Sequence, residues 1–245
     1  MTLRRKVSLG LFWEGGAMLA GRGLSLLVTI ILARLIAPEY FGLVSIATLA
    51  INSLVFFQEL GFGAALIYRR QEDVETAAQT AHWTIVASSL LLYAIGFLAA
   101  PLVAWFFRSP EVVPVLRVLL LTIVISSLGR VPFTLLARDL DFRKKVIPEF
   151  IAGLGGNLLA VILALGGWQV WALVWGQVID NIISTVLVYG VTRFAWRPRR
   201  VFDRRLFREL FGYGKHVAAS QVLIFGITNI DDMFVGRMLG QAALG

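Results

Sequence analysis

The chain alternates long apolar stretches with short polar connections. A helix needs about 20 mostly apolar residues to cross the hydrocarbon core of a membrane, and buried helices of a soluble protein are shorter. Six stretches meet that length and a seventh follows near the end: about 10–35, 41–67, 79–105, 113–137, 147–166, 169–192 and 213–238. The pattern therefore predicts an all-α integral membrane protein.

Small residues recur at every fourth position in two of these stretches. The first stripe is Ala17, Gly21, Ser25, Thr29 and Ala33, and the second is Ala152, Gly156, Ala160 and Ala164. Such stripes let a neighbouring helix approach closely. We therefore expect both to be packing surfaces.

A proline interrupts the fourth stretch, in the segment 129–132. Proline lacks a backbone N–H, so it frees a carbonyl and kinks a spanning helix. We expect a break there, beside Arg130.

The corner between the first two stretches returns at the end of the chain. Placed without a gap against residues 236–245, residues 33–42 pair Arg34 with Arg237 and Gly42 with Gly245. Six helices followed by a repeat of the first is the layout of a transporter built from parallel repeats. We expect a six-helix transmembrane lobe at 1–194, a basic interfacial cytoplasmic linker at 195–212, and the first transmembrane helix of a truncated second lobe at 213–245. The chain would then be a fragment.

Composition and charge agree with this interpretation. The chain is 58% hydrophobic and 16% charged, whereas ordinary soluble domains are nearer half apolar and a quarter charged. Most of its 23 basic residues fall on the side of the N-terminus if the helices alternate, while Arg34, Arg108 and Arg237 fall on the other. This asymmetry predicts a cytoplasmic N-terminus. The net charge of +8 is then explained by the orientation of the chain in the membrane. We therefore expect no nucleic-acid partner.

Metal and cofactor chemistry has little support. The chain has no cysteine and only two histidines, His82 and His216, which are too far apart in sequence to suggest a metal cluster. The N-terminal apolar run is longer than the core of a cleaved signal peptide. It is better interpreted as a retained first helix.

Polar residues inside the apolar stretches are the candidates for function. Arg22 and Arg130 are deep cations that need a partner or water, and Glu14, Glu59 and Asp180 are possible structural partners. Gln177, Asp180, Asn181, Ser184 and Thr185 share one helix face by their spacing. Asp231 and Asp232 lie in the seventh stretch. The carboxylates could serve ion coupling, with interhelical hydrogen bonding as the alternative.

The basic linker contains a predicted short helix. Asp203 is placed to cap it, with Leu206, Phe207, Leu210 and Phe211 on one side and arginines on the other. A helix of this kind lies flat at a membrane surface. Orientation and anchoring account for its charge, so a role in recruiting substrate is the lesser alternative.

Five segments of the chain resemble those of a known family. The segments ARLIAPEYFGLVSIA, ELGFGAALIYRR, ARDLDFRKKVIPEF, GGWQVWALVWGQ and DDMFVGRMLGQAALG resemble the polysaccharide-exporter branch of the multidrug/oligosaccharidyl-lipid/polysaccharide transporter superfamily. The resemblance is nearest to the bacterial oligosaccharide-lipid flippases.

The resemblance implies two six-helix lobes around a central cavity and alternating access in the bacterial inner membrane. The implied substrate is an undecaprenyl-pyrophosphate-linked oligosaccharide for O-antigen, capsule or exopolysaccharide synthesis. Membrane lipids are implied contacts, with a polysaccharide polymerase and glycosyltransferases of the same pathway as partners. Arginine pairs with phosphate oxygens through its planar fork, so Arg22 and Arg130 become substrate-path candidates.

Two other functions remain open. A multidrug and toxin extruder of the same superfamily would have an aromatic and acidic cavity rather than deep arginines. A membrane enzyme of polysaccharide synthesis would need a polar catalytic loop, and the only long loop is the basic linker, with one Asp and one Glu. We expect a transporter and no enzymatic activity.

Overall fold

The computed structural model describes residues 3–59, 74–138, 142–192, 196–199 and 201–208, and the single positions 212, 235, 237 and 238. The side chains of Glu14 and Glu59, residues Asp231 and Asp232, and nearly all of the predicted seventh helix lie outside the described part. The second-lobe boundary therefore stays a prediction.

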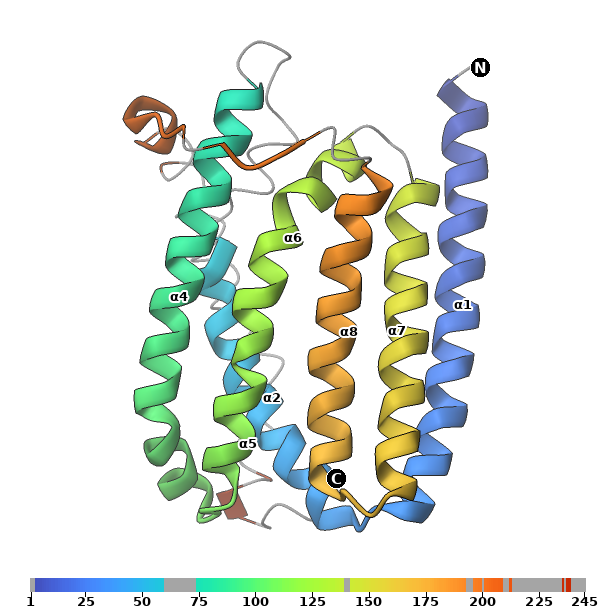
Figure 1. Ribbon diagram of the computed structural model, residues 1–245, viewed down its shortest axis with the longest axis vertical. Helices are drawn as coiled ribbons and strands as arrows, with labels where there is room; N and C mark the ends of the chain where they lie inside the picture. The colour runs from blue at the N-terminus through green and yellow to red at the C-terminus, as the bar shows by residue number, and fades with distance from the viewer. Residues whose placement is uncertain are drawn as a thin grey trace.

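The described residues form helices and no strand, which confirms the all-α class (Figure 1). The helices are α1 (Leu3–Leu35), α2 (Pro38–Glu59), α4 (Val74–Phe107), α5 (Val112–Leu119), α6 (Leu121–Arg138), α7 (Phe142–Leu165) and α8 (Val170–Val191). Segments within α2, α4, the α5–α6 pair, α7 and α8 are long and apolar enough to cross a membrane. The protein is a multi-pass membrane protein.

The helices run up and down between two ends of the bundle (Figure 1). The connections at 36–37, 108–111 and 166–169 lie at one end, here called the corner end. The start of α1, the end of α8 and the segment 196–208 lie at the other, here called the linker end. Neighbouring helices pack in the order α1, α7, α8, α6, α4, and α2 packs against α4 and α5.

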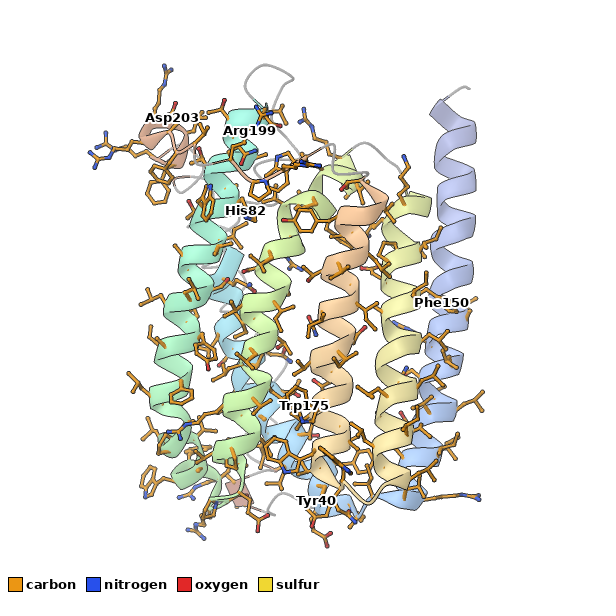
Figure 2. The ribbon with its side chains drawn as sticks, in the orientation of Figure 1. Tyr40, His82, Phe150, Trp175, Arg199 and Asp203 are labelled. Carbon is orange, nitrogen blue, oxygen red and sulfur yellow. The ribbon has the colours of Figure 1, made fainter. Side chains whose placement is uncertain are left out.

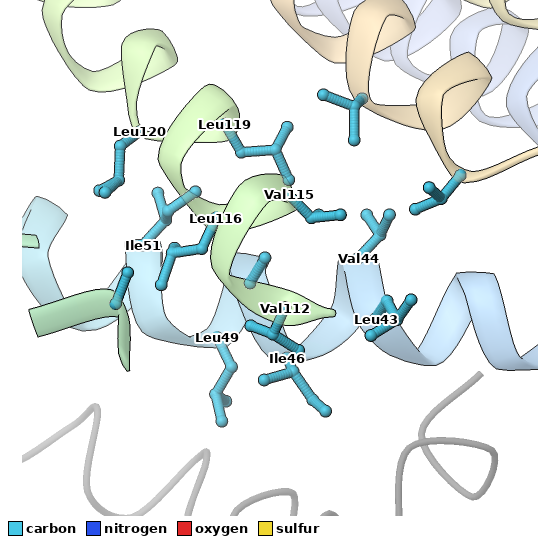
Figure 3. Packing of buried hydrophobic residues seen from close by; sticks show 14 of the residues in the cluster. Leu43, Val44, Ile46, Leu49, Ile51, Val112, Val115, Leu116, Leu119 and Leu120 are labelled. Atoms are coloured by element: carbon cyan, nitrogen blue, oxygen red, sulfur yellow. The ribbon is translucent and has the colours of Figure 1, made fainter. Parts of the chain in front are cut away.

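The core at the corner end holds α2 against the short helix α5 (Figure 3). Leu43 and Ile46 of α2 and Val112, Leu116 and Leu119 of α5 are each at most 1% exposed. In lipid, such close van der Waals packing replaces the hydrophobic effect as the force between helices. It fixes the corner end of the fourth span.

The break in the fourth span falls at Leu120, not at residues 129–132. Leu120 keeps helix-like angles (φ −58°, ψ −23°) between α5 and α6, and α6 continues through Pro132. The helix is therefore not interrupted there, but α6 bends near its linker end, as a proline in a helix is expected to cause (Figure 1). The expected free carbonyl is present, because Pro132 has no N–H for the carbonyl of Leu128, four residues earlier.

Side chains of neighbouring helices hydrogen-bond two of these freed carbonyls. The Tyr189 hydroxyl on α8 donates to the Leu128 carbonyl at 2.8 Å. Pro101 in α4 similarly leaves the Phe97 carbonyl, and Arg117 Nε donates to it at 3.4 Å. The Arg117 guanidinium also lies 4.2 Å from the centre of the Phe97 ring. Proline is tolerated in spanning helices when a neighbour supplies the missing donor.

The two small-residue stripes differ in what they do. Ala152, Ala160 and Ala164 of the second stripe are at most 6% exposed, and a Cβ added at Gly156 would come within 2.6 Å of the Gly176 carbonyl oxygen on α8. That stripe packs as predicted.

The first stripe does not face α7 over the part whose side chains the structure describes, and the Ala17 side chain lies outside that part. Its Ser25, Thr29 and Ala33 are exposed, and α1 instead buries Val28 and Leu32 in a cluster with Ala160 of α7. A four-residue spacing predicts a stripe, but not which side of the helix receives the neighbour.

The segment 196–208 docks on the linker end of α4 (Figure 2). Gln79 donates to the Arg197 carbonyl at 2.8 Å and accepts from the Arg199 N–H at 2.6 Å, and Trp83 Nε1 donates to the Arg199 carbonyl at 2.7 Å. These bonds hold the segment in an extended form beside the first turns of α4.

Asp203 caps the short helix that follows, as predicted. Its carboxylate accepts from the N–H groups of Arg205 at 2.7 Å and Leu206 at 3.2 Å. Leu206 is buried against the alanines at the start of α4. His82 is buried in edge-on contact with Trp83 and with Trp196 of the segment, which agrees with a structural role.

Candidate functional site

A polar cavity of about 150 Å³ lies among α6, α7 and α8. It lies toward the linker end of these helices, inside the spanning region. Its lining residues are Ser126, Gly129, Arg130, Phe133, Glu149, Asn181, Ser184, Thr185 and Val188. Polar side chains inside a spanning bundle mark functional paths by default.

Arg130 of α6 and Glu149 of α7 form the charged pair of this cavity. The Glu149 carboxylate acts electrostatically on the Arg130 guanidinium, and both line the same space. The expected structural partners were Glu14, Glu59 and Asp180. The carboxylate beside Arg130 belongs instead to Glu149, which the sequence did not single out.

The positions of Arg130 and Glu149 along their helices place them at a similar depth. Arg130 lies about two turns before the end of α6, and Glu149 about two turns after the start of α7. Both ends lie at the linker end of the bundle, so the two residues lie at a similar depth. Counting turns from the start of α7 gives the depth of Glu149, but not the face of the helix on which it lies.

The α8 wall of the cavity is made by three residues of the predicted polar face. Asn181, Ser184 and Thr185 line the cavity. The Thr185 hydroxyl donates to the Ile125 carbonyl of α6 at 3.1 Å, and Asn181 Nδ2 donates to the Gln177 carbonyl at 2.9 Å. The hydroxyl and amide oxygens can therefore act as acceptors in the cavity, and the Asn181 amide has a second N–H donor.

Gln177 and Asp180 lie on the same helix but outside the cavity lining. Gln177 is exposed. Asp180 lies at the close crossing of α7 and α8, where a Cβ added at Gly156 would come within 2.7 Å of the Asp180 Cβ. None of the described residues donates a hydrogen bond to its carboxylate. It is a half-buried acid beside the cavity wall.

Arg22 is not brought to this cavity. It lies on an exposed face of α1, which packs on α7 at the edge of the row of helices. The other intramembrane arginine, Arg117, is engaged with the Phe97 carbonyl and ring. Of these three arginines, Arg130 is the one that lines a polar cavity within the described part of the chain.

The arrangement suits reversible binding of an anion. A guanidinium presents planar, fixed-charge donors to phosphate-type oxygens, and Glu149 balances its charge when no anion is bound. An anion that enters this cavity would therefore meet a cation whose charge a nearby carboxylate already opposes. Among the described residues, no group of His, Cys, Asp and Glu side chains is placed to hold a metal ion.

Comparison with known proteins identifies relatives over most of the chain. Residues 31–245 match the family described as "Polysaccharide biosynthesis protein". The succinoglycan biosynthesis transport protein ExoT of Rhizobium meliloti (strain 1021) is 29% identical over 223 residues, which are 91% of this chain and 44% of that protein.

Two further relatives agree. The teichuronic acid biosynthesis protein TuaB of Bacillus subtilis (strain 168) is 29% identical over 188 residues, 76% of this chain and 38% of that protein. The lipopolysaccharide biosynthesis protein WzxC of Escherichia coli (strain K12) is 24% identical over 245 residues, 100% of this chain and 50% of that protein.

The comparison with solved structures found no match. The chain spans half the length, or less, of these curated relatives. With a family match over most of its residues and a bundle of membrane-spanning helices, this chain belongs to the polysaccharide biosynthesis protein family.

Proposed function

We propose that this chain forms one lobe of a transporter that moves undecaprenyl-pyrophosphate-linked oligosaccharide across the bacterial inner membrane, from the cytoplasmic to the periplasmic leaflet. Family membership and the name of the succinoglycan transport protein support transport in polysaccharide synthesis. The observation that carries the finer proposal is Arg130, a cation in a polar cavity within the spanning region.

Arg130 would hold a pyrophosphate oxygen, and Glu149 would limit how tightly it does so. Transport requires release as well as binding, so a site with an unopposed cation would retain the anion. Exchange of the Arg130 donors between Glu149 and the pyrophosphate gives both steps. The polar oxygens of Asn181 and Ser184 suit the adjacent sugar hydroxyls.

A second lobe would complete the central cavity and allow alternating access. Ion coupling belongs to the same proposal, with Asp180 as its candidate among the described acids, because a half-buried carboxylate in a spanning segment can bind a proton or sodium. We also propose that the N-terminus lies in the cytoplasm. The transporter would act together with a polymerase and glycosyltransferases of the same pathway. The multidrug extruder has less support, because it would have an acidic cavity. Here the charge of Glu149 is balanced by that of Arg130, so the cavity has no net negative charge from this pair.

The test compares Arg130→Ala with Glu149→Gln in the protein expressed from its complete gene. Arg130→Ala should weaken binding of undecaprenyl pyrophosphate in nanodiscs about tenfold or more, as expected for loss of a charge-assisted hydrogen bond. Glu149→Gln should tighten binding, because the cation loses its competitor. Both should lower export of polysaccharide when measured at equal protein levels in a strain that lacks the native gene.

The matched control is Arg117→Ala, which removes another intramembrane arginine. Arg117 is bonded to the Phe97 carbonyl, so its loss should lower stability but leave lipid pyrophosphate affinity per folded molecule within about twofold. Changes of the same sign in Arg130→Ala and Glu149→Gln would contradict the exchange. Unchanged export in Arg130→Ala would contradict the site.

A further inference from the structure

A second cavity, of about 650 Å³, lies at the corner end where α4 meets α5. It is separate from the cavity at Arg130, which lies toward the linker end. Two arginines far apart in sequence, Arg108 and Arg237, line it together with Trp105 and two prolines. In Figure 1 the short coloured piece that contains Arg237 lies beside the lower ends of α4 and α5.

Arg237 is anchored to the end of α4 through one of its N–H groups. Its Nη1 donates to the Phe106 carbonyl at 2.7 Å, and its guanidinium lies 5.3 Å from the centre of the Phe106 ring. Phe106 is in the last turn of α4, where carbonyls have no helical donor. A guanidinium has five N–H donors, and the described residues give the others no acceptor.

Arg108 occupies a position that favours glycine. It follows the last residue of α4 with a φ of 54°, and the Ser109 N–H bonds the Ala104 carbonyl at 3.0 Å as the chain turns. Glycine is preferred in this left-handed position because it has no Cβ. Arg108 therefore has a strained backbone conformation that glycine would adopt without strain. Strain of this kind suggests that the arginine side chain has a function.

The surroundings fit a lipid phosphate better than a soluble anion. Trp105 is 71% exposed and lies between the apolar part of α4 and its end, the position of an interfacial tryptophan. Pro101, Ala104 and Val113 give the rest of the lining an apolar surface. Glu111, the acid of the same turn, is exposed and is not part of the lining.

We propose that this corner cavity binds the phosphate group of a membrane lipid, held between the Arg108 and Arg237 guanidiniums with the acyl or prenyl chain along α4. Arginine pairs with phosphate through two parallel N–H donors, and two arginines that line one cavity could both contact the same phosphate. This site is separate from the cavity at Arg130, so a negative result for one proposal would not contradict the other.

The test uses Arg108→Gly, which removes the charge while supplying the residue that the backbone favours. The protein from its complete gene is placed in detergent, and binding is measured by native mass spectrometry. Three probes are compared: phosphatidylglycerol, undecaprenyl pyrophosphate and inorganic pyrophosphate. We expect Arg108→Gly to weaken lipid binding about tenfold or more while the melting temperature is unchanged or raised.

The second variant is Arg237→Gln, which keeps a donor for the Phe106 carbonyl but loses the charge. It should weaken lipid binding similarly. Arg34→Ala is the matched control, because Arg34 is exposed at the same corner end and is not part of the lining. Comparing the two lipids in the wild type identifies which phosphate-bearing lipid is preferred.

Three outcomes would overturn the proposal. Lipid affinity unchanged in Arg108→Gly is the first. An equal loss in Arg34→Ala is the second, because it would indicate general attraction to basic residues. Inorganic pyrophosphate binding the wild type as tightly as either lipid is the third. If Arg237→Gln does not fold, Arg108→Gly decides the result alone.

Discussion

Tyr189 and Arg117 each bond a backbone carbonyl that a proline leaves without its helical donor. The prolines lie four residues later in the chain, at Pro132 and Pro101, and the donors come from neighbouring helices. Hydrocarbon offers no water to an unpaired carbonyl. Single side chains thus allow α4 and α6 to carry proline without ending, and Tyr189 holds α6 two residues from Arg130.

Tyr189→Phe should lower the free energy of unfolding by about 1 kcal/mol, because it leaves the Leu128 carbonyl unpaired. In a Pro132→Ala background the same change should cost much less, since alanine restores an N–H donor to that carbonyl. Unfolding of the purified protein in mild detergent, followed by circular dichroism, measures both.

Tyr93→Phe is the control for loss of a phenol group. Tyr93 packs against Phe97 at a ring-centre distance of 5.9 Å, and its hydroxyl bonds none of the described residues. Equal costs for Tyr189→Phe with and without Pro132 would show that the freed carbonyl is not what the hydroxyl stabilises.

At the scale of elements, α7 and α8 form a hairpin whose two helices approach closely. Gly156 and Gly176 face each other across it, so the two backbones approach without side chains between them. The hairpin carries Glu149 on one helix and Asn181 on the other. The spacing of α7 and α8 therefore sets the width of the cavity at Arg130.

Gly156→Ala should destabilise the protein by about 1–3 kcal/mol, the usual cost of forcing extra atoms into a packed core. The new Cβ would lie 2.6 Å from the Gly176 carbonyl oxygen, and backbone cannot move aside as a side-chain tip can. The melting temperature should fall, and the affinity for undecaprenyl pyrophosphate should change with it.

Gly153→Ala supplies the comparison, on the same helix one turn earlier. A Cβ there would meet no neighbouring heavy atom within 4 Å, so alanine should be neutral or stabilise the helix by up to about 1 kcal/mol. Similar melting temperatures for Gly153→Ala and Gly156→Ala would refute the close approach.

At the scale of the whole molecule, charge divides the bundle into two unlike ends. The linker end carries the segment 196–208, with several arginines around the capped helix, and the corner end carries short turns. A membrane protein keeps most Lys and Arg of its short loops in the cytoplasm. The linker end is therefore expected on the cytoplasmic side.

Single cysteines should report this orientation without background, because the chain has none. Glu111→Cys, an exposed position at the corner end, should react with a membrane-impermeant maleimide in intact spheroplasts. Phe202→Cys, 52% exposed at the linker end, should react only after the membrane is opened. The reverse pattern would place the N-terminus outside and require the transport direction to be reconsidered.

The sequence alone predicted the long helices of the described part and most of the turns between them. Runs of apolar residues, the glycines near 166 and the cap at Asp203 act through neighbours in the chain, so their effect is local and can be deduced from order. Membership of the family also followed from the sequence, since its motifs lie in these corners and loops.

Only the tertiary structure decided which polar residues meet. A spanning helix is apolar on most faces, so its sequence does not specify its rotation about its axis. That rotation, together with the order of neighbours, places Glu149 beside Arg130, turns Asp180 toward Gly156 and leaves Arg22 on an exposed face. Helix rotation and the order of neighbours also decide that the stripe on α1 does not face α7 and that Tyr189 reaches the Leu128 carbonyl. Both arise from packing between segments that are distant in the chain.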